Sequence, residues 1–405
     1  MGASDAGSRT LSVVIPAWNE EDGIATIMER VMAVQPALAE VGVNELELIV
    51  VDDGSSDRTA EVVRACQGAR LVRHDANRGY GAALKTGFSA ATGDLLGFLD
   101  ADGTYPPECF PDLCREAQTG AELIVGSRRS GADSQMPLVR RIGNLLWSNL
   151  VTLLTNHRVQ DPASGMRVFG RDVLERLYPL PDGLNFTPVM STRAVHEGLC
   201  LVEVPIPYRE RLGRSKLSVV EDGMRFLRTI IWTALTYNPV RILGGVGLGL
   251  LAIAGLIAGV LIAMRIAGVT TLGPWGVGAV FAAVVLATAG VDIFALGVTF
   301  NYLVSLFHQS PIRQGLFGKP VFKTPLDRHF WWVGLLGAVA GLAFGAVSLV
   351  LGMRGWPIER LWLYLLAGTL LVLLGTQLVV FWVIVRVLEE LSQREALVEA
   401  DLGQP

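Results

Sequence analysis

Two aspartates separated by a single residue end a short apolar run. Asp100 and Asp102 follow LLGFL (95–99) within DLLGFLDADGTYPPE (94–108). Carboxylates two positions apart at a strand end can turn toward one hard divalent cation, which also takes phosphate oxygens and water as ligands. We therefore predict that Asp100 and Asp102 hold Mg²⁺ or Mn²⁺ beside a phosphorylated substrate. Loop acids without a function are the alternative for this motif taken alone.

Two further apolar runs end in turns that are rich in polar side chains, VVIPAWNEE (13–21) and VVDDGSSDRT (50–59). Ordinary turn and capping chemistry would explain either motif alone, with Asn19 as the cap of a following helix. Two such turns on adjacent strands favour a ligand, because acids at strand ends bind base or ribose groups in nucleotide-binding sheets. We predict this contact for Asp52 and Asp53.

A glycine pair precedes a helix-like stretch in NRGYGAALKTG (77–87). Gly79 and Gly81 stand before it, and Lys85 lies within it. A lone GxG is a weak signal, since glycine also permits tight packing. Beside the acidic turns, the segment is a candidate wall for a diphosphate.

The elements that must position these residues alternate along the chain. Short apolar runs, separated by longer helix-like stretches, predict an α/β domain with a mainly parallel sheet. In such sheets, ligands bind at the carboxyl ends of the strands, where the polar turns fall. The runs are LSVVI (11–15), LELIVV (46–51), LLGFL (95–99) and ELIVG (122–126).

The rest of the chain has a different composition. Hydrophobic residues make up 51% of the sequence, and its mean hydropathy of +0.43 is high for a soluble enzyme. Residues 242–307 carry only Arg265 and Asp292 as charged side chains. The sequence predicts four transmembrane helices in two hairpins, each with the roughly 20 residues that span a bilayer. The segments are 242–264, 276–304, 332–353 and 361–385, and residues 290–303 resemble 375–388.

An amphipathic stretch precedes the first apolar segment. Between residues 217 and 235, apolar side chains recur three or four positions apart, which is typical of a helix along a membrane surface. A core-facing helix is the alternative. The expected divisions are a catalytic domain (1–210), a phosphate loop with a surface helix (211–238), a first hairpin (239–307), a connection (308–330), a second hairpin (331–388) and a polar tail (389–405).

The distribution of positive charge predicts the orientation in the membrane. Lys and Arg gather in the connection 308–330 rather than in the two hairpin loops. This bias predicts an integral plasma-membrane protein with the catalytic domain on the cytoplasmic side. The N-terminus has no apolar run behind a basic cluster, so we expect no signal peptide. The connection carries Arg313, Lys319, Lys323 and Arg328. The first hairpin loop carries Arg265, and the second carries Arg354 and Arg360.

Composition also excludes some classes of function. The net charge of −4 and the lack of a basic tract argue against nucleic-acid binding. The cysteines lack CxxC spacing and the five histidines are scattered, so free thiols are expected rather than a zinc site.

Seven motifs in this order resemble those of family-2 glycosyltransferases of the GT-A fold, and within them the polyprenyl-phosphate sugar transferases. These include dolichyl-phosphate mannose synthases and undecaprenyl-phosphate glucosyltransferases. The resemblance covers residues 10–235, and the membrane part resembles, less specifically, members with four helices in two hairpins. The motifs are VVIPAWNEE, VVDDGSSDRT, NRGYGAALKTG, DAD at 100–102, VGSRR (125–129), QDPASGMRVF (160–169) and RLGRSKL (211–217).

The resemblance implies a role for each matching residue. The nucleoside of a sugar-nucleotide donor would be held by Pro16, Asn19, Glu20, Asp52 and Asp53, with Lys85 also in the nucleotide site, and the metal on its diphosphate by Asp100 and Asp102. The lipid phosphate would be addressed by Arg128, by Arg140 or Arg141, and by Ser164 near Asp161. A loop with Arg211, Ser215 and Lys216 would close over the phosphates. The catalytic set would be Asp100, Asp102, Asp161, Arg128 and Arg211.

The implied reaction is inverting transfer of a hexose-type sugar from a UDP- or GDP-sugar to undecaprenyl or dolichyl phosphate at the cytoplasmic face. The lipid phosphate would attack the anomeric carbon, and a strong general base is unnecessary because a phosphate monoester, with a second pKa of about 6, is largely dianionic at pH 7. The partners would be the donor, the acceptor and the bilayer, and the sequence is compatible with a homo-oligomer.

One position departs from the family pattern. Many relatives have a metal-binding Gln two places after the second aspartate, and this chain has Thr104, which puts that ligand in doubt. The sequence disfavours two alternative functions. A processive polysaccharide synthase would carry QxxRW, which is absent, and a nucleotide-regulated transporter would need more ionisable residues within the spans than Asp292.

Overall fold

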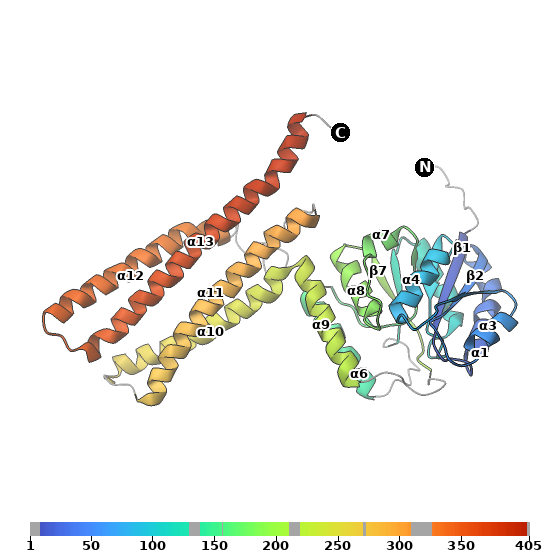
Figure 1. The fold of residues 1–405 in the computed structure, drawn as a ribbon, viewed down its shortest axis with the longest axis horizontal. Coiled ribbons are helices and arrows are strands. Elements are labelled where there is room, and N and C mark those ends of the chain that lie inside the picture. The colour runs from blue at the N-terminus through green and yellow to red at the C-terminus, as the bar shows by residue number, and fades with distance from the viewer. Residues whose placement is uncertain are drawn as a thin grey trace. The chain divides into compact units, whose positions relative to one another are not determined.

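The computed structural model describes residues 9–128, 138–155, 157–209, 219–269, 273–308 and 326–402 (Figure 1). The chain divides into two compact units, Met1–Thr233 and Ala234–Pro405. The first unit holds the sheet and the second holds the long apolar helices, and each is described by itself.

The first unit is built on a seven-stranded sheet in the order β3-β2-β1-β4-β6-β5-β7. All described neighbours pair in parallel except β6, which is antiparallel to β4 and β5. The predicted mainly parallel α/β fold is confirmed. Three strands were not predicted: β3, β6 and β7. The strands are β1 (Arg9–Ala17), β2 (Val43–Asp52), β3 (Ala69–Arg73), β4 (Leu95–Phe98), β5 (Leu123–Ser127), β6 (Arg167–Gly170) and β7 (Leu201–Pro205).

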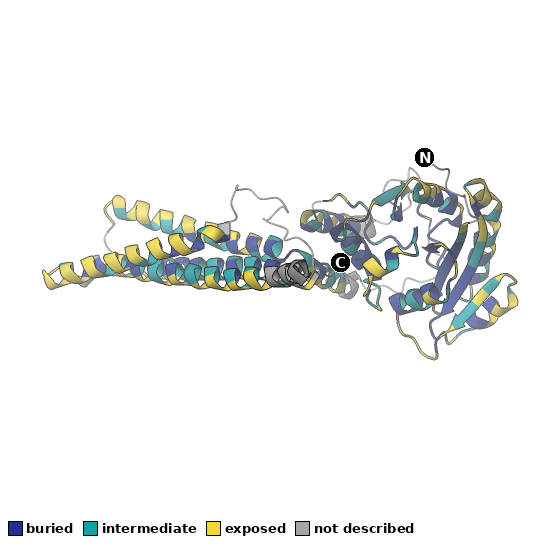
Figure 2. Cartoon of the chain, turned by 90° about the horizontal axis from the view of Figure 1, so that it is seen from above, coloured by how far each residue is buried: buried dark blue, intermediate teal, exposed yellow. Residues whose placement is uncertain are grey.

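Helices cover both faces of this sheet. Because side chains alternate along a strand, Val13 and Ile15 of β1 pack into one core while Val14 packs into the other. The inner strands β1, β4 and β5 are accordingly mostly or fully buried, whereas the edge strands β3 and β7 are partly exposed; Figure 2 shows both kinds of strand. On the first face lie α1 (Ile24–Ala33), α2 (Gln35–Glu40), α3 (Thr59–Ala65), η1 (Pro107–Cys109) and α5 (Phe110–Gln118), and on the second α4 (Tyr80–Ala90), α7 (Val173–Leu177) and α8 (Phe186–His196).

The strand order reverses between β1 and β4. Chain connections run from β1 to β2 and β3 on one side, and the chain then returns to place β4 on the other side of β1. Ligand sites in open α/β sheets form at such a reversal, beyond the carboxyl ends of the strands. The acidic turns after β1, β2 and β4 all lie at this edge.

Two amphipathic helices, one within the first unit and one that ends just beyond its boundary at Thr233, carry apolar residues that are exposed. These are α6 (Leu138–Thr155) and α9 (Val219–Tyr237), and they touch through Trp147 and Phe226, whose ring centroids are 6.3 Å apart. The sequence predicted a helix near α9 but not α6. Exposed fractions of 42% to 65% mark Leu145, Leu146 and Leu153 of α6 and Met224 and Trp232 of α9.

The second unit consists of two helical hairpins, α10 (Pro239–Ile266) with α11 (Pro274–His308) and α12 (Phe330–Met353) with α13 (Ile358–Leu402), with η2 (Leu326–His329) before α12. Within the part of the chain that the structure describes, four stretches are long and apolar enough to cross a bilayer, which confirms the four predicted helices: Pro239–Ile266, Pro274–Val304, Asp327–Met353 and Leu363–Leu391. Exposed residues run along these helices (Figure 2).

Glycines allow the helices of each hairpin to approach closely. A Cβ at Gly247 would lie 2.6 Å from the carbonyl oxygen of Gly290, and one at Gly341 would lie 2.4 Å from that of Gly368. Small residues at helix crossings are the usual means of packing in membranes, where burial of apolar surface adds little.

A polar contact joins the two hairpins. The Asp327 carboxylate accepts hydrogen bonds from the Tyr302 hydroxyl (3.0 Å) and from Arg386 Nη2 (2.9 Å). Asp327 is 5% exposed, so this pair of contacts fixes the end of α11 against α13.

Gly81, in the first turn of α4, lies against the loop before α8. A Cβ at this position would lie 2.1 Å from the Pro181 carbonyl oxygen and 2.9 Å from the Phe186 ring. Its amide and that of Ala82 donate to the Asp182 carbonyl at 2.7 and 3.1 Å. The glycine therefore permits the close packing of this loop on α4.

We expect Gly81→Ala to lower the free energy of unfolding by about 1 to 3 kcal/mol, because backbone atoms must move to admit the methyl group. Gly143→Ala is the control, since nothing lies within 4 Å of its added Cβ and alanine favours a helix by up to about 1 kcal/mol. Thermal unfolding of the full chain in detergent measures both. Equal stability of the two variants would contradict the packing role.

Candidate active site

The turns after β1 and β2 are joined by hydrogen bonds. The Asn19 side-chain oxygen accepts from the Ser56 amide at 2.8 Å, and the Asn19 amide donates to the Ser55 hydroxyl at 2.9 Å. The Glu20 amide donates to the Thr59 hydroxyl at 2.9 Å. Asn19 has φ of +53° and does not cap α1, which begins at Ile24, so the predicted cap was wrong. Asn19 instead holds the two turns together.

The two aspartates after β2 have different surroundings. Asp52 is buried, accepts the Ser55 amide at 2.9 Å and lies 3.0 Å from Arg73 Nε. Asp53 accepts the amides of Arg78 and Gly79, both at 2.8 Å, and lies 2.7 Å from His74 Nδ1. Asp53 therefore fixes the turn before α4, while Asp52 lies at the edge with Pro16, which pairs with Val51.

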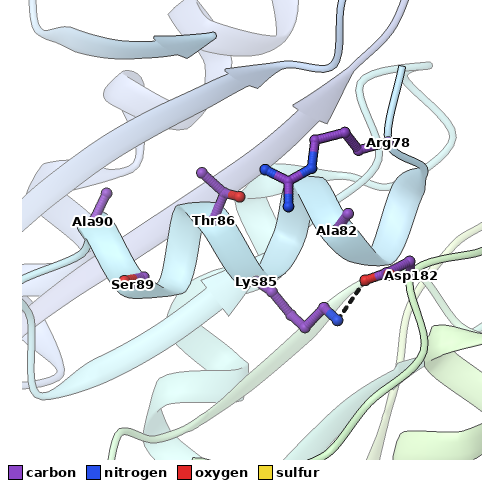
Figure 3. A pocket seen from close by; sticks show the side chains of 7 residues that line it. All are labelled: Arg78, Ala82, Lys85, Thr86, Ser89, Ala90 and Asp182. Carbon is purple, nitrogen blue, oxygen red and sulfur yellow. Dashed lines mark ion pairs between the residues drawn. The ribbon is translucent and has the colours of Figure 1, made fainter. Parts of the chain in front are cut away.

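Lys85 lines a shallow cavity of about 450 Å³ along α4 (Figure 3). Its ammonium lies 2.5 Å from Asp182 and donates to the Leu180 carbonyl at 3.0 Å. Together with Gly79 and Gly81, which pack on the loop 181–183, it ties that loop to α4. The lining residues are Arg78, Ala82, Lys85, Thr86, Ser89, Ala90 and Asp182.

Asp100 and Asp102 follow β4 at the same edge. Asp100 accepts a hydrogen bond from the Tyr80 hydroxyl at 2.7 Å. Asp102 accepts from the Thr104 hydroxyl at 2.6 Å and from its amide at 3.1 Å. Burial, and next the charge of Asp100, raise the pKa of Tyr80 well above its ordinary value, so this phenol stays a donor. The two hydrogen bonds of Thr104 show that its hydroxyl is directed at Asp102.

This pair fits a divalent cation. Among the described residues, no group of three or more His, Cys, Asp or Glu side chains could share a metal ion. Two carboxylates suffice for Mg²⁺ or Mn²⁺, which complete their shells with phosphate oxygens and water. Gly165 makes room for the first carboxylate, since a Cβ there would lie 2.4 Å from Asp100 Oδ2. A side chain at residue 165 would displace the Asp100 carboxylate.

Arg128, which is largely buried, and the fully buried Asp161 form an ion pair, and the Arg128 guanidinium is close enough to Asp100 for their charges to interact. Arg128 donates to Asp161 through Nε (2.8 Å), Nη2 (2.7 Å) and its amide (3.0 Å). Asp161 is fully buried, and the Asn144 amide group also donates to it at 2.9 Å. Burial would raise the pKa of Asp161, but Arg128 and these hydrogen bonds lower it below its ordinary value. The guanidinium lies 5.5 Å from the Tyr105 ring centroid.

The other residues assigned to the acceptor phosphate differ in position. Ser164 is buried, and its hydroxyl donates to the Gly126 carbonyl at 2.6 Å. Arg141 is exposed on α6, and Arg140 lies in the same helix, its side chain outside the described residues. Arg211, Ser215 and Lys216 also lie outside the described residues.

Sequence reasoning missed four side chains that hold this site: Tyr80, Asn144, Arg167 and Glu203. Arg167 is fully buried and donates to the carbonyls of Pro162 (2.8 Å), Ser164 (3.2 Å) and Thr187 (3.0 Å). Burial lowers its pKa to about 10. An arginine that begins an apolar run, as in RVF (167–169), was the available signal.

Comparison with known proteins places these residues in context. A model described as Glycosyl transferase family 2 matches residues 12–178, and one described as a domain of unknown function (DUF8752) matches residues 239–399. An undecaprenyl-phosphate 4-deoxy-4-formamido-L-arabinose transferase of Photorhabdus laumondii is 30% identical over 76% of this chain and 93% of its own. A dolichyl-phosphate hexose transferase of Haloferax volcanii is 30% identical over 56% of this chain and 94% of its own.

Among solved structures, glucosyl-3-phosphoglycerate synthase of Mycobacterium tuberculosis, in complex with Mn²⁺, UDP and phosphoglyceric acid, is similar to part of this chain. It is 27% identical, with a TM-score of 0.44, over 56% of this chain and 78% of its own.

The Arg128–Asp161 pair predicts a pH dependence of stability. Folding lowers the pKa of Asp161. The carboxylate therefore contributes to the free energy of unfolding above about pH 4, and this contribution is lost as the pH falls through the lowered pKa. Asp161→Asn should therefore lower Tm at pH 7, and the difference from the unmutated chain should narrow below about pH 4. Thermal unfolding of the full chain between pH 7 and 3 measures this.

Asp112→Asn is the matched control, because the ion pair of Asp112 with Arg115 is exposed and surface pairs stabilise little. Its Tm should follow that of the unmutated chain throughout. A Tm difference for Asp161→Asn that stays constant with pH would contradict the ion-pair account.

Proposed function

The chain belongs to glycosyl transferase family 2, and we propose that it transfers a hexose-type sugar from a UDP- or GDP-sugar to the phosphate of a polyprenyl phosphate. The observation that carries the proposal is the carboxylate pair after β4 with the Arg128–Asp161 pair beside it. Both relatives are named as prenyl-phosphate transferases, which favours this reaction over polymer synthesis and over transport.

The donor would lie across the ends of β1, β2 and β4. Pro16, Asn19, Glu20 and Asp52 line the joined turns and are assigned to the nucleoside, with Asp53 shaping the turn before α4. Lys85 is assigned to the nucleotide as well, which requires it to exchange Asp182 for phosphate. Mg²⁺ or Mn²⁺ on Asp100 and Asp102 would supply positive charge to the leaving diphosphate.

Arg128 is assigned to the acceptor phosphate. Asp161 takes the Nε and Nη2 edge of the guanidinium, so the Nη1 edge is the donor that we assign to the lipid. An arginine already fixed by a carboxylate and an aromatic ring loses little freedom on binding phosphate. Ser164, Arg140 or Arg141, and Arg211 with Ser215 and Lys216 complete the assigned phosphate contacts.

The reaction follows from these positions. A phosphate oxygen of the lipid attacks the anomeric carbon, and the bond to the nucleoside diphosphate breaks with its electron pair leaving on the diphosphate. The acceptor is already anionic, so the residues of the chain have to orient the phosphate and offset charge rather than remove a proton. The sugar configuration inverts in this single displacement.

The membrane parts would hold the acceptor near the site. The acceptor phosphate lies at headgroup level, and the exposed apolar residues of α6 and α9 suit a membrane surface. The cations of 308–330 favour a plasma-membrane protein with the catalytic unit cytoplasmic. The homo-oligomer stays a prediction.

The test is a transfer assay with the full chain in liposomes that contain undecaprenyl phosphate. We expect one member of a panel of radiolabelled UDP- and GDP-sugars to label an organic-extractable lipid. Asp102→Asn should lower kcat by about 10²- to 10³-fold, as loss of a preorganised charge does. Asp112→Asn, on the surface of α5, should leave kcat unchanged. Label in a long polymer, or full activity in EDTA, would contradict the reaction or the metal, respectively.

A second prediction separates the two substrates. Arg128→Lys keeps a charge toward Asp161 but loses the fork of donors, so it should raise the KM for the lipid and leave nucleotide affinity unchanged. Asp52→Asn should weaken nucleoside diphosphate binding instead. Calorimetric titration of both variants measures this, and equal losses of nucleotide affinity would refute the division.

A further inference from the structure

The loop 160–166, which joins α6 to β6, is held by side chains from other elements. The Ser191 hydroxyl of α8 and Arg167 Nη2 both donate to the Pro162 carbonyl, at 3.0 and 2.8 Å. The Gly165 amide donates to the Tyr105 hydroxyl at 2.7 Å. The loop carries Asp161, so its backbone position decides where the partner of Arg128 lies.

Glu203 holds the beginning of this loop. Its carboxylate accepts the Gln160 amide at 2.9 and 3.0 Å and the Asp161 amide at 2.7 Å. Glu203 lies on the edge strand β7 and pairs there with Val125, three residues before Arg128. One carboxylate thus fixes the backbone of Asp161 from β7, which pairs with β5, the strand that Arg128 directly follows.

The contact of Glu203 with the loop costs free energy, because it partly removes a charged carboxylate from water. Burial raises the pKa of this half-buried carboxyl, and its amide hydrogen bonds act in the opposite direction. Carboxylates that accept backbone amides form stronger hydrogen bonds than neutral acceptors do. A second contact to Asp161, from Asn144 of α6, reaches its side chain and leaves the backbone amide to Glu203.

We propose that Glu203 is a positioning residue for the acceptor site. By binding the amides of Gln160 and Asp161, it sets the carboxylate that orients the Arg128 guanidinium toward the lipid phosphate. The inference rests on the proposed function, because Arg128 has this task only if the acceptor is a phosphate. Glu203 would act on the acceptor through this loop.

The test compares three variants of the full chain in liposomes with undecaprenyl phosphate. Glu203→Ala removes both acceptor oxygens. Glu203→Gln keeps one oxygen, and Glu203 Oε1 lies within hydrogen-bond distance of both amides. Glu47→Ala is the matched control, because Glu47 also accepts a backbone amide, that of Thr92. Its other partners are the hydroxyls of Ser12 and Thr92, and none of these residues belongs to the loop 160–166 or contacts Arg128.

We expect Glu203→Ala to lower kcat/KM for the lipid by about 10- to 100-fold, the range for partners that orient a site residue. Its affinity for nucleoside diphosphate should stay unchanged. Glu203→Gln should lower kcat/KM for the lipid by about fivefold or less, which is equivalent to the loss of one neutral hydrogen bond. Glu47→Ala should keep kcat/KM for the lipid whatever its effect on Tm.

Hydrogen exchange provides a readout that does not depend on transfer. Faster exchange at the amides of residues 160 and 161 in Glu203→Ala, but not in Glu47→Ala, would support the positioning of the loop. If the unmutated chain transfers no sugar to the lipid, the proposed function fails, and this exchange difference still tests the loop. Unchanged exchange, or equal losses of lipid and nucleotide use in Glu203→Ala, would overturn the proposal.

Discussion

Charge repulsion opposes the approach of a phosphate dianion to the diphosphate of a nucleotide sugar, and the active-site edge of the sheet is arranged around that repulsion. Carboxylates suited to a cation follow β4, and a guanidinium follows β5. The guanidinium is neutralised by Asp161 at 2.7 Å before any substrate arrives, so its burial is not left uncompensated. The carboxylates suited to a cation and the guanidinium paired with Asp161 are thus separate sites at one edge of the sheet.

The antiparallel strand β6 connects these two places. It lies between β4 and β5, and the loop 160–166 that leads into it reaches both: Gly165 packs against Asp100, and Asp161 holds Arg128. The loop is fixed by Glu203, Arg167, Ser191 and Tyr105, which come from four other segments. Such preorganisation is what electrostatic catalysis requires, because the charges need no rearrangement during reaction.

Much of the fold could be predicted from the sequence, and the reason is local. The strands β1, β2, β4 and β5 each contain a short apolar run, and the four spans are long apolar segments, so each is visible in its own residues. In contrast, β6 begins with a buried arginine and β7 contains Glu203, and both charged residues are explained only by partners elsewhere in the chain. Asn19 had the residue type of a helix cap, but its side-chain oxygen instead accepts a hydrogen bond from the amide of Ser56, 37 residues further along the chain.

The site residues also divide into those that the local sequence indicates and those that only the fold brings together. Residue types and strand ends indicated Asp100 and Asp102, and the family resemblance indicated Arg128. The hydrogen bonds of Tyr80 and Asn144, in contrast, connect segments whose proximity only the fold creates.

The anomeric configuration of the product tests the account most directly, because it reports whether the lipid phosphate itself attacks the sugar. The sugar-1-phosphate bond of the lipid product, determined by NMR after reaction with a donor of known configuration, should be inverted relative to the donor. Retention would contradict the single displacement and the assignment of Arg128 to the attacking phosphate.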